Sequence, residues 1–240
     1  MSIYHYPVDI IINSKPVTKF LHENKTYIEG RPGSKYSIQV KNPTSTRVKA
    51  VISVDGLSIL DGKPAGKESQ GYIIEAFGTL DIEGWRTSSS TVGAFEFGSR
   101  KDSYANKSGE GATNVGVIGV MIFQEDYNHH GYVKALYRSY QSPVFGSAGD
   151  VTFNATYSTC DSSDTVLASA ALCNNLGTGM GEDVLSHSTE VKFKAFNYPI
   201  QTSVIYYDDR KGLEARGIVV DPRKMHPDPF PASNAYCKRV

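Results

Sequence analysis

The chain has 240 residues, 40% of them hydrophobic and 11% aromatic, which is enough to bury a core without disulfide or metal support. Its 25 basic and 25 acidic side chains balance at neutral pH, which argues against a surface built to coat nucleic acid. No stretch approaches the roughly 20 apolar residues of a membrane-spanning helix. Composition and charge therefore predict a soluble globular protein without a membrane contact.

The N-terminus and the cysteines point to synthesis in a reducing cytoplasm. Residues 1–12 have no basic cluster before their apolar stretch, so they do not have the pattern of a secretory signal. The spacings of Cys160, Cys173 and Cys237 match neither a disulfide framework nor a zinc site, and we interpret the three as reduced thiols. A disulfide between Cys160 and Cys173 is the alternative.

The first half of the chain alternates apolar and polar residues with period two. This pattern over residues 36–40 and 47–54 predicts half-buried antiparallel strands. Asp55-Gly56 and Asp61-Gly62 supply residues that tolerate positive φ, as tight hairpin turns require. Further short apolar runs, typical of a sandwich or barrel, are residues 57–60, 72–77, 80–82 and 94–97.

Residues 115–123 are apolar on both alternating sets of positions, which predicts a central strand covered on both faces. Gly116 and Gly119 weaken a strand and therefore indicate that a ring or another backbone packs closely against them. Trp85 and Phe95 are the candidates for that ring.

The second half is predicted to be richer in loops. Residues 190–196 and 203–207 look like a hairpin or a sheet-crossing pair, and residues 164–173 and 209–216 like short helices, the latter ended by Gly217. Between them, residues 125–189 are rich in Ser, Thr and Gly, and we expect long loops there.

Proline is concentrated near the C-terminus, at Pro222, Pro227, Pro229 and Pro231, and predicts an extended arm. The predicted fold is thus mainly β: an antiparallel, jelly-roll-like β-sandwich with long loops and one or two short helices. We expect one domain over residues 1–220, with a loop-rich insertion at about 125–189, and the arm over residues 221–240.

Motifs that carry chemistry are weak in this sequence. The glycines Gly177, Gly179 and Gly181 lack the following Gly-Lys-Ser/Thr of a phosphate loop, so we interpret them as a flexible or tight-turning loop. The pair His129-His130 beside Asp126 is more typical of a solvated loop than of a metal site. Four scattered carboxylates are interpreted as turn and cap residues: Asp161, Asp164, Asp208 and Asp209.

No nucleophile elbow or cysteine-protease signature is present, so we predict no catalytic residue, no cofactor and no metal. The abundance of tyrosine, with fifteen copies, leaves two interpretations open. The rings line a sugar-binding cleft or a protein interface, or they fill strand faces.

Several motifs resemble those of a family of uncharacterised phage and prophage proteins. They are Ser53-Val54-Asp55-Gly56-Leu57-Ser58-Ile59-Leu60-Asp61-Gly62-Lys63, Gly71-Tyr72-Ile73-Ile74, Ile82-Glu83-Gly84-Trp85-Arg86, Ala94-Phe95-Glu96-Phe97, Ser103-Tyr104-Ala105, Gly116-Val117-Ile118-Gly119, Tyr206-Tyr207-Asp208-Asp209-Arg210 and Gly212-Leu213-Glu214. The resemblance covers roughly residues 30–220 and departs from the family pattern at 150–175. It carries no catalytic residue over to this chain.

The resemblance implies a virion component, synthesised in the bacterial host cytoplasm and built into the particle. We expect a non-enzymatic decoration, collar or fibre-base protein on the capsid or neck that contacts other virion proteins, contacts no nucleic acid directly and forms homo-oligomers. The expected interaction residues lie in the arm: Pro222, Pro227, Pro229, Phe230 and Tyr236.

Two other classes of function stay open. A host-surface or glycan-binding module would use the loop tyrosines Tyr132, Tyr137 and Tyr140. A virion-associated hydrolase would need two close carboxylates in a cleft.

Overall fold

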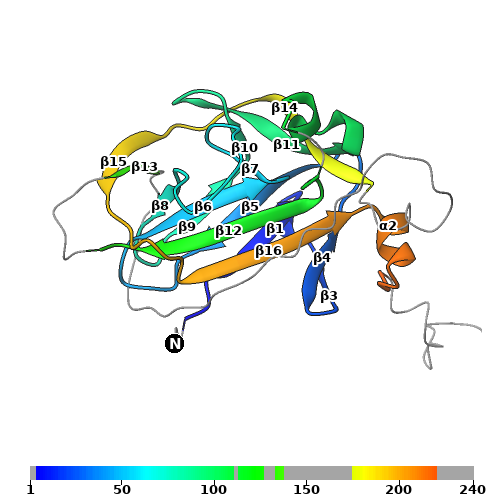
Figure 1. Ribbon diagram of the computed structural model, residues 1–240, viewed down its shortest axis with the longest axis horizontal. Coiled ribbons are helices and arrows are strands. Elements are labelled where there is room, and N and C mark those ends of the chain that lie inside the picture. The colour runs from blue at the N-terminus through cyan, green and yellow to red at the C-terminus, as the bar shows by residue number, and fades with distance from the viewer. Residues whose placement is uncertain (1–3, 111–112, 127–132, 138–174, 221–240) are drawn as a thin grey trace, which may run out of the picture.

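The computed structural model describes residues 4–110, 113–126, 133–137 and 175–220, with the backbone alone for 133–137. In this part of the chain two β-sheets pack face to face, and short helices lie near their ends (Figure 1). The mainly β sandwich with short helices is therefore confirmed. The jelly-roll-like connectivity stays a prediction, and the helix expected over residues 164–173 lies outside the described residues.

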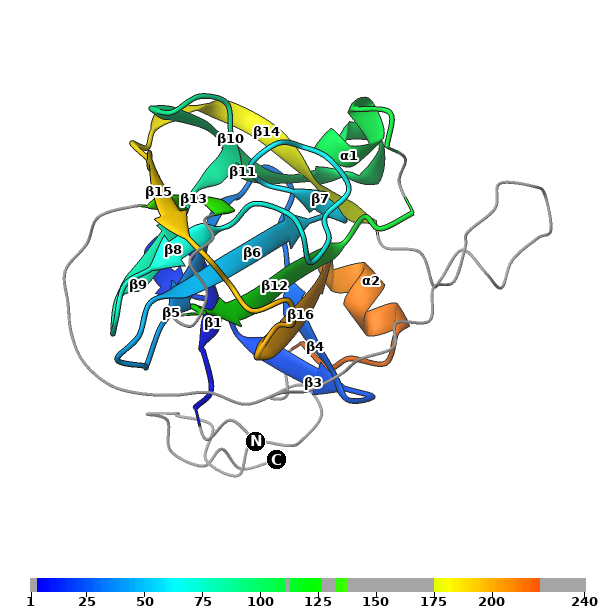
Figure 2. The same cartoon turned by 60° about the vertical axis from the view of Figure 1, so that its left-hand side comes forward.

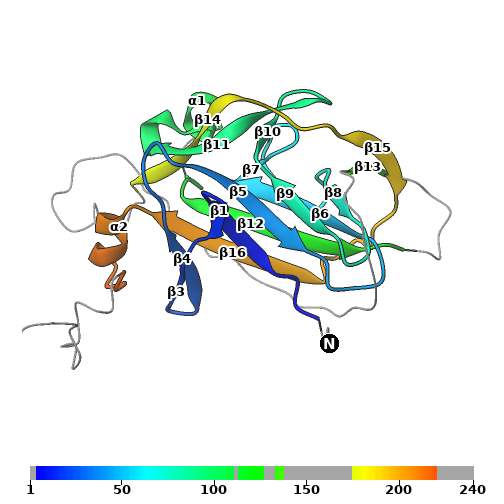
Figure 3. The ribbon, with the colours of Figure 1, turned by 180° about the vertical axis from the view of Figure 1, so that it is seen from behind.

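The seven-stranded sheet is antiparallel throughout and is seen from outside in Figure 3. Its strands are β1 (Val8–Ile12), β2 (Lys15–Pro16), β5 (Lys35–Lys41), β9 (Thr79–Ile82), β10 (Gly84–Arg86), β11 (Thr91–Ser99) and β14 (Leu176–Leu185). The order is β10-β11-β5-β1-β2, with β9 beside β5 and β14 along the other edge of β11.

The nine-stranded sheet has the order β15-β13-β8-β6-β12-β16-β4-β3, with β7 beside β6. Its strands are β3 (Lys19–His22), β4 (Lys25–Glu29), β6 (Val48–Val54), β7 (Leu57–Ser58), β8 (Tyr72–Ile74), β12 (Val117–Gln124), β13 (Val133–Tyr137), β15 (Thr189–Phe193) and β16 (Gln201–Asp208). Two of its pairs are parallel, β13 with β8 and β16 with β4, whereas the sequence predicted antiparallel strands only.

Two-residue turns make the local hairpins. Asp55 and Gly56 have φ values of 52° and 82° and join the paired residues Val54 and Leu57, as in a type I′ turn, so this predicted hairpin is confirmed. Residues 13–14 and 23–24 also have positive φ and join β1 to β2 and β3 to β4. The sequence analysis missed those two hairpins because Ser14 and Glu23 are uncommon residues at positive φ.

The chain crosses between the sheets at several corners, among them the one from β2 into β3 and the one from β14 into β15 (Figure 1). At the second corner Arg86 Nη2 donates a hydrogen bond of 2.6 Å to the hydroxyl of Tyr72, and Nη1 donates one to the carbonyl of Ser186. The amide of Ser186 donates to the carbonyl of Ser90 at 2.8 Å. These bonds tie the crossing segment to both sheets.

Aromatic side chains fill the space between the sheets at the end where η1 (Arg100–Asp102) and α1 (Tyr104–Lys107) lie. Trp85 meets Phe95 edge to face, with ring centroids 5.5 Å apart, and Tyr36 stacks on Phe97 at 4.3 Å. All four rings are buried. Burying rings of this size stabilises the fold by roughly 2–3 kcal/mol each.

Strand β12 is central in its sheet, as predicted, but it is not covered equally on both faces. Ile118, Val120 and Ile122 point into the core and are buried, whereas Val117, Gly119 and Met121 on the other face are only half-buried. The expected ring beside the glycines is absent from Gly119, whose nearest described neighbour is the hydroxyl of Ser53 on β6. Gly116 lies just before the strand with φ of 95°, so its role is in the turn.

Two expectations for the second half are corrected. Residues 176–185 are not a loop but the strand β14, because this segment pairs along the whole of β11 and its glycines face close neighbours. A Cβ at Gly177 would lie 2.6 Å from Cβ of Ser103. The segments 190–196 and 203–207 do not form a hairpin with each other, since β15 pairs with β13 while β16 pairs with β12 and β4. The predicted last helix is confirmed as α2 (Arg210–Ala215), capped by Asp209 and followed by Gly217 at φ of 77°.

Candidate functional site

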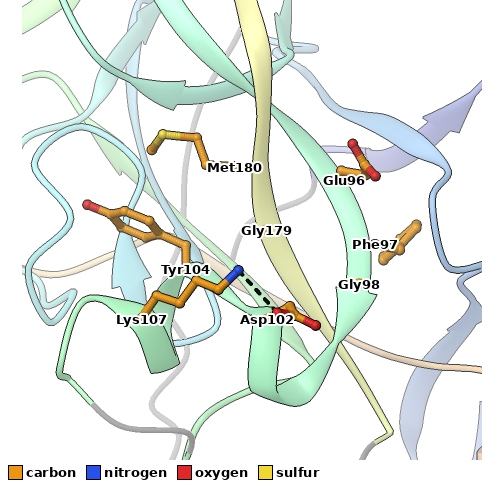
Figure 4. Close-up of a pocket in the computed structure, with 8 residues that line it drawn as sticks. All are labelled: Glu96, Phe97, Gly98, Asp102, Tyr104, Lys107, Gly179 and Met180. Atoms are coloured by element: carbon orange, nitrogen blue, oxygen red, sulfur yellow. Dashed lines mark ion pairs between the residues drawn. The ribbon is translucent and has the colours of Figure 1, made fainter.

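A pocket of about 250 Å³ opens where α1 meets the strand pair β11–β14 (Figure 4). Its floor is low because Gly98 and Gly179 carry no side chain and no other atom lies within 3.5 Å of where their Cβ atoms would be. The lining side chains come from four elements: Glu96, Phe97, Asp102, Tyr104, Lys107 and Met180.

The charged side chains of this pocket largely satisfy one another. Lys107 Nζ lies 3.2 Å from Asp102 Oδ1, and the hydroxyl of Ser99 donates to Asp102 Oδ2 at 2.7 Å. The hydrogen bond from Ser99, followed by the hydrogen bond and charge of Lys107, lowers the pKa of Asp102. A carboxylate that stays ionised in water accepts hydrogen bonds from a ligand, but it is a poor proton donor.

The aromatic wall of the pocket is anchored in the core. The ring of Tyr104 lies 4.6 Å from that of Trp85, and the indole N–H of Trp85 donates to the carbonyl of Gly179 at 3.2 Å. The wall is therefore preformed. The pocket combines one half-buried ring with exposed polar groups, an arrangement suited to a small polar ligand or to one edge of a sugar.

The most strongly perturbed titratable groups lie elsewhere, inside the sandwich. Asp55 Oδ1 accepts hydrogen bonds from the hydroxyl of Tyr207 at 2.5 Å and from the amide of Gly116 at 2.9 Å, and Oδ2 accepts from the amide of Thr178 at 2.8 Å. The hydroxyl of Thr178 lies 2.8 Å from those of both Tyr207 and Tyr36. These four side chains are called the Asp55 network.

The hydroxyl groups of the Asp55 network donate in a chain that ends at the Asp55 carboxylate. Since the proton of Tyr207 goes to Asp55, the proton between Thr178 and Tyr207 belongs to Thr178, and the proton between Tyr36 and Thr178 belongs to Tyr36. Burial raises the pKa of Asp55 to about 6, although the hydrogen bonds from Tyr207, Thr178 and Gly116 oppose that rise. Burial also raises the pKa of both tyrosines well above the usual value.

The Asp55 network stabilises the fold and does not contact solvent. Its four side chains have exposed fractions of 4% or less. Perturbed pKa values mark candidate functional sites only where a substrate has access. Here the carboxylate instead joins the β6–β7 turn to the start of β12, to β14 and to β16, and so fastens one sheet to the other.

The two most exposed large apolar side chains of the described residues lie on edge strands. Leu21 on β3 is 78% exposed and Leu185 at the end of β14 is 75% exposed. Within the described residues β3 is hydrogen-bonded to β4 alone, so its other edge is open. The edge of the seven-stranded sheet is instead closed: β2 has two residues, one of them Pro16, and Lys19 Nζ donates to the carbonyl of Val8 at 2.6 Å.

Most of the residues singled out from the sequence lie outside the described residues. These are Cys160, Cys173, Cys237, His129, His130, Tyr132, Tyr140, Asp161, Asp164, Pro222, Pro227, Pro229, Phe230, Pro231 and Tyr236. Tyr137 is on β13, where the backbone alone is described.

Asp208 and Asp209, the two predicted turn or cap residues that the structure describes, have different roles. Asp209 caps α2 as predicted, accepting from the amide of Gly212 at 2.7 Å. Asp208 is not a turn or cap residue but the buried last residue of β16, where it accepts from the amides of Asn175 and Asp209 and lies 3.6 Å from Arg216. Burial raises the pKa of Asp208. The sequence offered no signal for this position because one partner, Asn175, lies 33 residues earlier and another, Arg216, lies beyond α2.

No three His, Cys, Asp or Glu side chains among the described residues come together as a metal site requires. No helix among them is both long and apolar enough to cross a membrane. The chain matches no family model, no curated protein and no solved structure.

Proposed function

We propose that this chain is a bacteriophage virion structural protein, attached to the capsid or neck as a decoration, collar or fibre-base protein, that acts by protein–protein assembly. The observation that carries the proposal is the position of the exposed leucines. Leu21 and Leu185 lie on edge strands, each beside one of the corners at which the chain changes sheets. The motif resemblance to phage and prophage proteins supports the placement in a virion.

Strand addition at β3 is the proposed mode of attachment. The open edge of residues 19–22 presents backbone N–H and C=O groups, to which an extended segment of a neighbouring subunit adds as a further strand. Leu21 then packs against that segment, and burying an exposed leucine contributes roughly 2 kcal/mol. The partners are other virion proteins or further copies of this chain. The mode of action requires neither a cofactor nor catalysis.

A host-surface or glycan-binding module is the second candidate. It is favoured by the pocket beside α1, where the half-buried ring of Tyr104 lies next to the polar groups of Asp102 and Lys107. A sugar would lie against the ring and hydrogen-bond to the charged groups. Binding to a glycan array that is lost in Tyr104→Ala would favour this candidate over the first.

Cosedimentation with phage particles tests the first candidate. Full-length protein carrying Leu21→Asp is incubated with particles that lack the chain, in parallel with wild type and with Gln70→Asp, a substitution at an exposed position off the strand edges. We expect wild type and Gln70→Asp to sediment with the particles and Leu21→Asp to stay in the supernatant. Wild-type protein that stays monomeric and fails to bind particles contradicts the proposal.

A further inference from the structure

The outer face of the nine-stranded sheet is open in its middle. Gly119 on β12 lies between Val204 on β16 and Ser53 on β6, and Met121 lies beside Thr202. All five residues point away from the seven-stranded sheet; Val204 is 41% exposed and the others are half-buried. Figure 2 shows β6, β12 and β16 side by side, with α2 beyond the end of β16. We call Val204, Gly119, Met121 and Thr202 the open rows.

The same face is covered on both sides of the open rows. Toward α2, Tyr27 and Tyr206 lie side by side with centroids 5.4 Å apart and pack with Leu213, Ile218 and Val220. In the other direction, Phe123 is buried, with Lys49 Nζ lying 4.7 Å from its ring centroid. The open rows are therefore a gap in an otherwise covered apolar surface. A gap of this kind bordered by packed side chains is a seat for a further apolar group.

Gly119 leaves the centre of the gap without a side chain of its own, and the hydroxyl of Ser53 lies 2.6 Å from where its Cβ would be. A strand glycine often marks the close approach of another chain segment. Val204 and Met121 offer apolar atoms beside Gly119.

The segment that follows α2 packs at the edge of the open rows. Ile218 and Val220, which follow α2, pack in the cluster with Tyr206, and Tyr206 is two residues from Val204 on the same face of β16. Two residues of a strand span about 7 Å, so a few residues beyond 220 suffice to reach Val204. The sequence continues for 20 residues and contains Met225 and Phe230. Attachment in the same chain raises the effective concentration of such a segment to the millimolar range.

We propose that residues 221–240 of the same chain dock on the outer face of the nine-stranded sheet and place Phe230 in the open rows, against Val204 and Met121. The segment thereby continues the packing that Ile218 and Val220 begin. The proposal concerns the isolated chain and does not depend on a virion partner.

Photo-cross-linking in the full-length chain tests the proposal. Phe230 is replaced by p-benzoylphenylalanine, the purified protein is irradiated at low concentration, and the cross-linked peptides are identified by mass spectrometry. We expect an intramolecular cross-link to Met121 or Val204 in protein of monomer mass. In Val204→Asp this cross-link falls by about tenfold, because the apolar group would then contact a charge. In Leu185→Asp, at a more exposed position on the other sheet, it stays at the original yield.

A second measurement uses the chain without the photoreactive group. Hydrogen exchange of residues 221–240 is expected to be slower in the unmodified protein than in Val204→Asp, and unchanged in Leu185→Asp. Cross-links found only at dimer mass overturn the proposal in favour of a second copy as the occupant. Cross-links to other regions, or exchange equally fast in both proteins, overturn it outright. Particle binding is absent from both measurements, so their failure is distinct from failure of the proposed function.

Discussion

The hydroxyl of Tyr207 donates a hydrogen bond of 2.5 Å to Asp55, a residue 152 positions earlier in the sequence. Asp55 occupies a tight hairpin turn, a position that is usually exposed, yet its exposed fraction is only 2%. Two backbone amides, of Gly116 and Thr178, complete the set of donors. One carboxylate thus bonds to groups from both sheets: Gly116 and Tyr207 come from neighbouring segments of its own sheet, and Thr178 comes from β14 of the other sheet.

The raised pKa of Asp55 predicts a stability that depends on pH. Its value of about 6 in the folded protein exceeds the ordinary value of 3.8, so the folded state binds the proton more tightly. The resulting contribution is fully present below about pH 4 and is lost as the pH rises through 6, and it amounts to about 3 kcal/mol. Urea unfolding of wild type between pH 4 and 7, compared with Asp55→Asn, measures it.

We expect the difference in unfolding free energy between wild type and Asp55→Asn to change over this pH window. Asp208, whose pKa is also raised by burial, contributes equally to both proteins and cancels. The matched control is Asp61→Asn, at an exposed turn position, which should follow wild type at every pH. A difference that stays constant from pH 4 to 7 contradicts the assignment.

Replacing Tyr207 by Phe removes the hydroxyl that bonds to both Asp55 and Thr178. We expect a loss of about 1–3 kcal/mol, since Asp55 loses one of its donors and the buried hydroxyl of Thr178 loses its acceptor. The pKa of Asp55 rises further, because the hydrogen bond from Tyr207 holds it down, and the pH-dependent loss of stability moves to higher pH. Chemical unfolding and a carboxyl NMR titration follow the two effects. Tyr206→Phe, on the other face of β16, is the control, and equal losses in both variants would refute the role of the network.

The close contact between β10 and β11 predicts a severe effect for Gly84→Ala. A Cβ at this position would lie 2.0 Å from the carbonyl oxygen of Gly93, which is backbone and has no room to move without breaking the ladder. We expect a loss of about 3 kcal/mol or more in unfolding free energy. Gly66→Ala, where no atom lies within 4 Å, should change stability by less than about 0.5 kcal/mol. Comparable denaturation midpoints for the two variants would contradict the prediction.

Arg86 is predicted to hold the corner between β14 and β15. Its Nε and Nη2 atoms both donate to the hydroxyl of Tyr72, at 3.0 and 2.6 Å, while Nη1 donates to the carbonyl of Ser186. Lysine has a single nitrogen and cannot reproduce this fork. We expect Arg86→Lys to cost about 1–3 kcal/mol and to speed hydrogen exchange at residues 185–189. Arg31→Lys, with a side chain 73% exposed, should leave both unchanged. Slow exchange at the corner in Arg86→Lys would show that other contacts hold it.

Local patterns predicted the strands whose apolar residues alternate. Residues 36–40 and 47–54 form β5 and β6, and the Asp55-Gly56 turn lies between β6 and β7, because hairpins form between neighbours in sequence and depend on local residues. The same approach missed β3 and β4, whose turn at Glu23-Asn24 has no glycine. It also assigned β14 to a loop. Three glycines in ten residues are typical of a loop, and the pairing of this segment with β11 cannot be inferred from the residues around it.

The sites were less predictable than the strands. The pocket beside α1 and the Asp55 network each gather residues from segments far apart, such as Glu96 with Lys107 and Gly179, or Asp55 with Thr178 and Tyr207. No spacing of residues in the sequence indicates that these segments come together. The sequence predicts only a turn at Asp55, because the turn depends on neighbouring residues, whereas the partners of its side chain lie far away in the sequence.

The parallel pairing of β4 with β16 constrains when the chain folds. Thr26 and Tyr27 find their partners in Ile205 and Tyr206, so the earlier segment waits for one that is synthesised much later. Until residues 201–208 have been synthesised, β4 and β12 each lack a neighbour and present open backbone groups. Over that interval the nascent chain is exposed to misassembly, and chains that stop short of β16 are candidates for capture by chaperones.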